Sequence, residues 1–122
     1  MTIKLGRRAE ITRTYSFADK ALFADLAGLG EAWLDSVPEP LVGALFSYLL
    51  GVELPGFGTN YLKQEMRFLM PAPYDTPLTA SVTVTRLRPE KHLVDLETVC
   101  VGADGSRICE GRALVYVEDV GA

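Results

Sequence analysis

The sequence has little of several features that mark specialised classes of protein. It contains two cysteines, one histidine and one tryptophan in 122 residues. Its longest apolar run, Leu41 to Val52, is far shorter than a membrane span. The N-terminal stretch Met1 to Tyr15 lacks the continuous apolar segment of a signal peptide. We therefore expect no membrane partner and a cytoplasmic location.

Basic residues are also scarce and scattered. Twelve Lys and Arg residues stand against sixteen Asp and Glu residues, which gives a formal net charge of -4 at pH 7. A nucleic-acid-binding surface usually shows a broad basic stripe that neutralises phosphates. The sequence contains no such block, so we expect no nucleic acid partner.

The two cysteines flank a predicted hairpin turn with the sequence GADG, so Cys100 and Cys109 could face each other across two strands. A cytoplasmic location disfavours a disulfide, and neither the cysteine spacing nor a nearby histidine suits a metal site. The one histidine, His92, lies in a polar turn. We expect two buried or half-buried thiols, no metal ion and no redox cofactor.

What is present fits one compact domain spanning 1–122. Hydrophobic residues make up 48% of the chain and charged residues 23%, as in ordinary globular proteins. A chain of 122 residues can enclose one core but is too short for two ordinary domains.

Two helices and a first strand are predicted in the N-terminal half. Partial alternation between Ile3 and Tyr15 indicates a strand, and Ser16 is placed to cap a short amphipathic helix that ends at Gly28. Leu41 to Leu50 is apolar almost all round, which predicts a buried helix ending at Gly51.

After Gly58 the hydrophobic pattern changes to period two. Alternation recurs in four segments, 59–71, 78–89, 92–105 and 106–119, and the turn residues between them predict hairpin connections. The clearest turn is at 103–105. The predicted fold class is therefore α+β, with an antiparallel sheet wrapped around one long central helix.

Several stretches resemble the MaoC-like family of hot-dog proteins, which includes (R)-specific enoyl-CoA hydratases and 3-hydroxyacyl thioester dehydratases. They are ALFSYLLG at 44–51, LPGFGT at 54–59, the pair Tyr61 and Leu62, Phe68 to Pro71, and LTASVTV at 78–84. The resemblance implies a single hot-dog domain and a homodimer whose sheets pair edge to edge. It also implies an acyl thioester partner, carried by CoA or by an acyl-carrier protein.

The sequence departs from that family where the family does its chemistry. A catalytic Asp and His follow the first helix in the family, and the matching positions here are Leu29 and Leu34. The family's central helix opens with His-Gly-Met, whereas this chain has Pro38, Glu39 and Pro40, so two backbone N–H donors are missing. We therefore expect acyl-thioester binding without hydratase activity.

Two other hypotheses remain open. Glu39 or Asp35, at the entrance of the central helix, could be the catalytic base of an acyl-CoA thioesterase, although the favoured interpretation is that a carboxylate there caps the helix. Alternatively, the chain could be a noncatalytic subunit that pairs with a competent hydratase chain.

Six residues are candidate substrate contacts, and four of them have a structural alternative. Ser47 could instead be a buried hydroxyl bonded back to its helix, and Asn60 could simply face solvent. Trp33 and Phe57 could pack in the core or at an interface. The full set is Gly43, Ser47, Asn60, Tyr61, Trp33 and Phe57.

Overall fold

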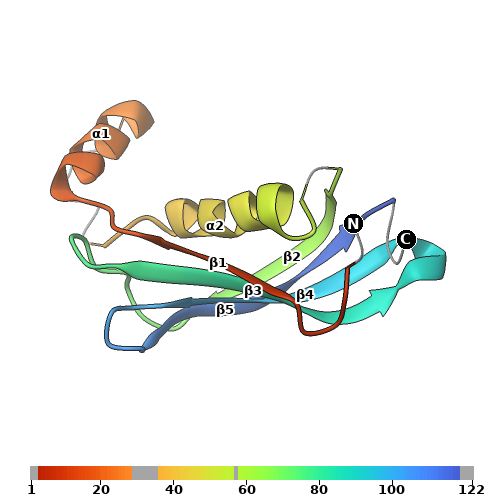
Figure 1. Ribbon diagram of the computed structural model, residues 1–122. Helices are drawn as coiled ribbons and strands as arrows, with labels where there is room; N and C mark the ends of the chain where they lie inside the picture. Colours follow the sequence, from red (N-terminus) through yellow and green to blue (C-terminus); the bar gives the residue numbers. More distant parts are fainter. Residues whose placement is uncertain (1–2, 29–35, 57, 119–122) are drawn as a thin grey trace.

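A computed structural model describes residues 3–28, 36–56 and 58–118 of the chain. Figure 1 shows one antiparallel sheet with a helix lying along one of its faces, so the α+β prediction is confirmed. The strands are β1 (Arg8–Arg13), β2 (Asn60–Phe68), β3 (Leu78–Arg88), β4 (Leu93–Val101) and β5 (Arg107–Tyr116). The helices are α1 (Phe17–Ala27) and α2 (Glu39–Tyr48), which continues into a π-helical turn, Leu49–Glu53; a 3-10 turn covers Pro89–Lys91.

The face of the sheet against α2, here called the inner face, carries the core. On β4 its side chains are Val94, Leu96, Thr98 and Cys100, all fully buried. They meet the buried stripe of α2 and its π-helical extension, which consists of Val42, Leu45, Phe46, Leu49 and Leu50. These positions recur every three to four residues, which is the spacing of a helix with one apolar side toward the core.

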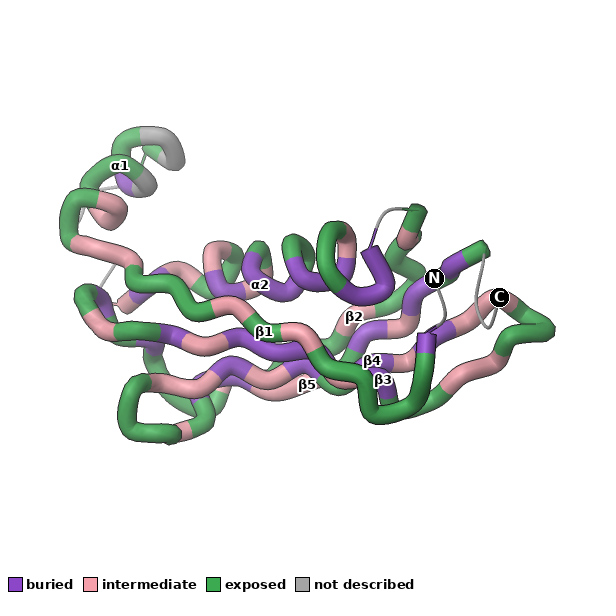
Figure 2. The backbone as a smooth tube through the Cα atoms, viewed as in Figure 1, coloured by how far each residue is buried: buried purple, intermediate pink, exposed green. Residues whose placement is uncertain are grey.

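Two expectations about the central helix are wrong. It is not buried all round, because Ala44, Ser47, Tyr48 and Val52 are exposed. Figure 2 shows the reason: the sheet covers one side of α2, and nothing described in the chain covers the other. The helix also runs past Gly51 to Glu53, and the chain turns extended only at Leu54.

The sheet order is β1-β3-β4-β5-β2. The predicted β3–β4 and β4–β5 hairpins are confirmed. A hairpin between β2 and β3 is wrong, since β2 pairs with β5 and becomes an edge strand. The connection at 69–77 contains Pro71, Pro73 and Pro77, which do not form the short turn of a hairpin. Alternation predicts that a segment is a strand but does not name its partner.

The β4–β5 turn and the two thiols lie where they are expected. The Gly102 amide donates to the Ser106 carbonyl over 2.9 Å, and Gly105 takes the left-handed conformation with φ 84°. Cys100 and Cys109 are direct partners across the two strands, and both are buried and free. Burial, and then the nearby Cys109 thiol, raise the pKa of Cys100 to about 11.

Helix α1 projects beyond the end of the sheet (Figure 1). It begins with a capping box in which Ser16 and Asp19 exchange hydrogen bonds, as its sequence predicts, and ends at Gly28 with φ 70°. The Phe17 ring stacks on Tyr74 with centroids 5.6 Å apart. Among the described helices, neither is long and apolar enough to cross a membrane.

Candidate functional site

One side of α2 meets the edge strand β2 along a line that we call the α2–β2 seam. It is defined by Glu39, Gly43 and Ser47 on α2 and by the inner-face residues of β2, which are Tyr61, Gln64, Met66 and Phe68. The three α2 residues are spaced four apart, so they lie above one another on one side of the helix. The seam therefore holds a carboxylate at one end and hydroxyl groups at the other.

A β-bulge gives β2 its seam residues. The register with β5 shifts between Tyr61 and Lys63, which leaves Leu62 unpaired and 56% exposed. Because side chains alternate along a strand, one extra residue brings Tyr61 onto the same face as Gln64 and Met66. Tyr61 pairs with Val115 and Gln64 with Ala113, both buried on the inner face.

Two contacts tie the helix to the strand along the seam. The Tyr61 hydroxyl donates to Ser47 Oγ over 3.2 Å. At Gly43, a Cβ atom would lie 3.4 Å from the Met66 Cε, so Met66 already fills the space beside this glycine. Ser47 is exposed, which makes the expectation of a buried hydroxyl wrong. Burial raises the pKa of Tyr61, and the bond to Ser47 opposes that rise only in part, so the phenol remains a proton donor at neutral pH.

Glu39 opens the seam at the start of α2. Pro38 is the N-cap residue and no side chain of the described residues caps this helix, so the expectation that Glu39 caps it is wrong. Glu39 instead borders a cavity of about 280 Å³, here called the Glu39 cavity. The cavity is lined by Ser36, Val37, Glu39, Phe68, Leu69, Met70, Pro71 and Ala72. Burial is the main cause of the raised pKa of the Cys109 thiol, and the negative charge of Glu39 is the second cause.

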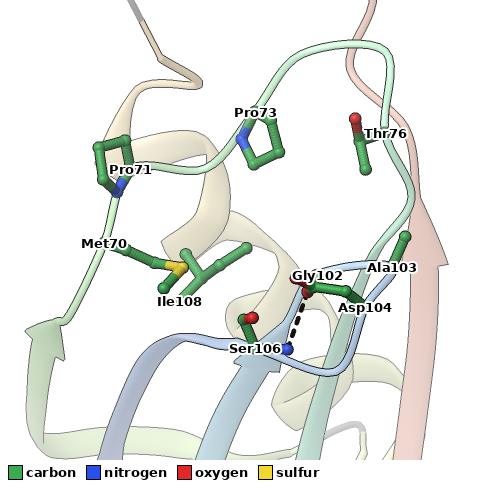
Figure 3. Close-up of a pocket in the computed structure, with 9 residues that line it drawn as sticks. All are labelled: Met70, Pro71, Pro73, Thr76, Gly102, Ala103, Asp104, Ser106 and Ile108. Atoms are coloured by element: carbon green, nitrogen blue, oxygen red, sulfur yellow. Dashed lines mark hydrogen bonds between the residues drawn. The ribbon is translucent and has the colours of Figure 1, made fainter.

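A second cavity, of about 390 Å³, lies between the 69–77 connection and the β4–β5 turn. Figure 3 shows Met70 and Pro71, which also line the Glu39 cavity, on one side of it and Gly102 to Ser106 on the other. Its one carboxylate, Asp104, accepts a hydrogen bond from the Ser106 amide over 3.0 Å, and this bond lowers the pKa of Asp104. The cavity is otherwise mainly apolar, so it offers room but no group ready for proton transfer.

Similarity to a known protein, rather than to a family model, assigns this chain to a family. No protein-family model matches the chain. The chain is 36% identical to the (R)-specific enoyl-CoA hydratase of Rhodospirillum rubrum over 128 residues, covering 94% of this chain and 88% of that protein. The chain belongs to the MaoC-like family of hot-dog proteins.

Solved structures agree with this assignment. The (R)-hydratase from Aeromonas caviae involved in PHA biosynthesis superposes with a TM-score of 0.84 and 31% identity, covering 94% of this chain and 97% of that one. R-hydratase PhaJ1 from Pseudomonas aeruginosa gives a TM-score of 0.81 with 28% identity, covering 94% of this chain and 82% of that one. The predicted hot-dog fold is confirmed.

The fold of this MaoC-like chain brings together only some of the site residues predicted from the sequence. Glu39, Gly43, Ser47 and Tyr61 all lie in the seam. Asn60 is exposed and pairs with the exposed Tyr116, so it lies on the opposite face of the sheet from Tyr61. The remaining candidates, Asp35, Trp33 and Phe57, lie outside the described residues.

One seam residue is missing from the sequence-based list. Gln64 lies on β2 between Met66 and Tyr61, and its Nε2 is buried with no hydrogen-bond partner among the described residues. Strict alternation from Tyr61 would have put Gln64 on the outer face, and only the bulge reverses this. The sequence feature that could have singled out Gln64 is an uncharged amide between two charged residues on a predicted strand.

Three basic residues of β2 and β3 pair with carboxylates on the outer face of the sheet. Lys63 pairs with Glu65 over 3.0 Å, Arg67 with Glu110 over 3.1 Å, and Arg88 with Asp95 over 2.8 Å. Each of these cations has a neighbouring carboxylate, as solvated strand faces commonly do. Among the seam residues, the Nε2 atom of Gln64 is buried and has no hydrogen-bond partner among the described residues.

Proposed function

We propose that this chain binds an acyl thioester, carried by CoA or by an acyl-carrier protein, on the α2–β2 seam, and that it does not hydrate enoyl thioesters. Its MaoC-like relatives are named as enzymes that act on enoyl-CoA. The observation that carries the proposal is the make-up of the seam. Apolar Met66 and Phe68 lie there next to the amide of Gln64 and the hydroxyl groups of Tyr61 and Ser47, and this arrangement suits an acyl chain with a polar head.

The proposed loss of hydratase activity follows from the absence of the groups that would transfer protons. Adding water to a double bond requires a group that accepts a proton and one that returns it, each worth about 10²- to 10⁴-fold in rate. The matching positions for the family's Asp and His carry Leu29 and Leu34, which transfer no proton. In the described part of the seam, Glu39 is the single carboxylate, while Ser47 and Tyr61 bond to each other.

A second copy of this chain is proposed to complete the site. Strand β2 is a free edge of the sheet, and exposed apolar side chains gather along it and along α2: Tyr48, Val52, Tyr61, Leu62, Met66, Leu69 and Met70. An edge of this kind pairs readily with another chain. The other edge, β1, exposes Arg8, Glu10 and Arg13 instead, so the β2 edge is the better homodimer surface. Sedimentation of the wild type and of Leu62→Glu tests this, with dimer and monomer as the expected species.

A thioesterase is the second candidate, because Glu39 borders a cavity instead of capping its helix. In that reaction Glu39 would take a proton from water as the water oxygen bonds to the thioester carbonyl carbon. The C–S bond would then break, the proton would pass from Glu39 to the sulfur, and the carboxylic acid and the free thiol would leave. The Glu39→Gln variant keeps the shape and removes the base.

A panel of acetyl-, butyryl-, crotonyl- and octanoyl-CoA separates these functions. Binding is followed by calorimetry, hydration by loss of enoyl absorbance from crotonyl-CoA, and hydrolysis by release of free thiol. The proposal predicts binding with neither reaction. Thiol release that collapses in Glu39→Gln would favour the thioesterase, and loss of enoyl absorbance would contradict the claim of lost hydratase activity.

A further inference from the structure

The starting observation is an amide in an unusual position. Gln64 Nε2 is buried and has no hydrogen-bond partner among the described residues. A buried donor left without an acceptor costs about 1–3 kcal/mol, so folded proteins normally pair such groups. An orphaned donor inside a candidate binding site therefore points to an acceptor that the chain itself does not supply.

The position of Gln64 along the seam indicates where that hydrogen-bond acceptor must lie. On the inner face of β2, Gln64 lies between Met66, which contacts Gly43, and Tyr61, which bonds to Ser47. The two neighbours on the strand, Lys63 and Glu65, face the other way and pair with each other over 3.0 Å. The amide therefore belongs to the seam, between the contact of Met66 with Gly43 and the hydrogen bond of Tyr61 with Ser47.

The groups on either side of Gln64 can move aside at low cost. Met66 has a flexible, unbranched side chain that is 40% exposed. The Tyr61–Ser47 hydrogen bond is solvent-exposed, and such a bond contributes little net stability because water replaces it. A ligand entering the seam can displace both contacts and then meet the amide.

We propose that Gln64 donates a hydrogen bond from its Nε2 to the carbonyl oxygen of the bound acyl thioester and so fixes the carbonyl within the seam. This inference rests on the proposed function and adds to it the group that holds the polar head of the ligand. Gln64 is then a binding residue, and the acyl chain lies along Met66. Asn60, the other amide of β2, faces away from the seam and does not share this role.

The test compares a thioester with a ligand that lacks the carbonyl. Butyryl-CoA and S-butyl-CoA, the thioether in which a methylene replaces the carbonyl, are titrated by calorimetry into the wild type and into Gln64→Met. Methionine has a similar length and shape but no donor. Lys63→Met is the matched control, because it makes the same side chain at the next position of the strand but on the outer face.

The expected result is a loss of affinity that depends on the carbonyl. Gln64→Met should weaken butyryl-CoA binding by about 2- to 12-fold, the equivalent of one neutral hydrogen bond, and leave S-butyl-CoA binding unchanged. Without ligand, Gln64→Met should be as stable as the wild type or more stable, because an unpaired donor has been removed. Lys63→Met should bind both ligands as the wild type does.

Three results would overturn the inference. Equal losses for both ligands would mean that Gln64 acts on packing, and unchanged binding of butyryl-CoA would mean that an internal water satisfies the amide. Lower stability of unliganded Gln64→Met would mean that the amide has a partner in the folded chain. If the wild type binds neither ligand, the proposed function itself fails, which is distinguishable from the first three outcomes.

Discussion

The two faces of strand β2 are organised in opposite ways. On the outer face, Lys63, Glu65 and Arg67 each pair with a neighbouring charge, and Glu65 also accepts from Arg112 over 3.2 Å. On the inner face, the buried nitrogen of Gln64 has no partner within the described part of the chain, and Met66 is partly exposed. The charged groups of the outer face are paired among the described residues, whereas the Gln64 amide of the inner face is not. This difference is the reason for proposing that a ligand binds on the inner face.

The largest loss of stability is expected from a substitution at Gly111, where strand β5 lies close to the backbone of β2. A Cβ atom at Gly111 would overlap the Glu65 carbonyl oxygen, which is rigid backbone of the paired strand. Gly111→Ala should therefore force β2 away from β5 and lower the free energy of unfolding by about 3 kcal/mol or more. Gly51→Ala is the control, because a Cβ there meets nothing within 4 Å. Equal stability of the two variants in urea melts would contradict this close approach.

The thiols of the inner face should make stability depend on alkaline pH. Burial and the Cys109 thiol raise the pKa of Cys100 from 9.0 to about 11, so the folded state holds this proton more tightly than the unfolded state. This contribution is fully present below pH 9 and is lost as the pH rises through about 11. Urea melts across that range should show a decline that Cys100→Val reduces. An identical decline in the variant would assign it to other groups.

The Tyr61–Ser47 bond should contribute modestly to stability. Tyr61→Phe removes the donor of an exposed hydrogen bond, so we expect a loss of about 0.5–1 kcal/mol in thermal or urea unfolding. Ser47→Ala should cost about the same, and the double variant should cost no more than either single change. Strictly additive losses would mean that the two hydroxyl groups do not interact.

The smallest effect is expected on the outer face. Lys63 and Arg112 lower the pKa of Glu65, so its contribution is present above the ordinary range of a glutamate and is lost as the pH falls through its folded pKa. Glu65→Gln should change stability only slightly at neutral pH, and the change should shrink further in high salt, because exposed ion pairs are weak and screened. A large, salt-independent loss would show that the outer face is not simply solvated.

Much of the architecture could be predicted from the sequence because it is recorded in local patterns. The Ser16 cap, the 102–106 turn and the alternating strands follow from hydrogen-bonding and conformational preferences of neighbouring residues. The position of β2 beside β5 could not be predicted, since strand partners are chosen by packing between segments distant in the sequence.

The candidate site shows the same division. The entrance of the central helix and Ser47 could be named from sequence, because they lie on one regular helix. Gln64 could not, since a single bulge at Leu62 changes which face each β2 residue occupies. The exposure of Ser47 and Tyr48 could not be predicted either, because the apolar composition of a helix does not say which of its sides the rest of the chain covers.

The most direct measurement is calorimetric titration of butyryl-CoA into the wild type, Gly43→Leu and Ala44→Leu. Leucine at position 43 fills the seam against the flexible Met66, whereas position 44 is exposed, and leucine suits a helix interior at both. If the seam is the binding site, the wild type and Ala44→Leu bind with the same affinity, and Gly43→Leu loses more than about tenfold while keeping its melting temperature. Equal binding by all three proteins would contradict a site on the α2–β2 seam.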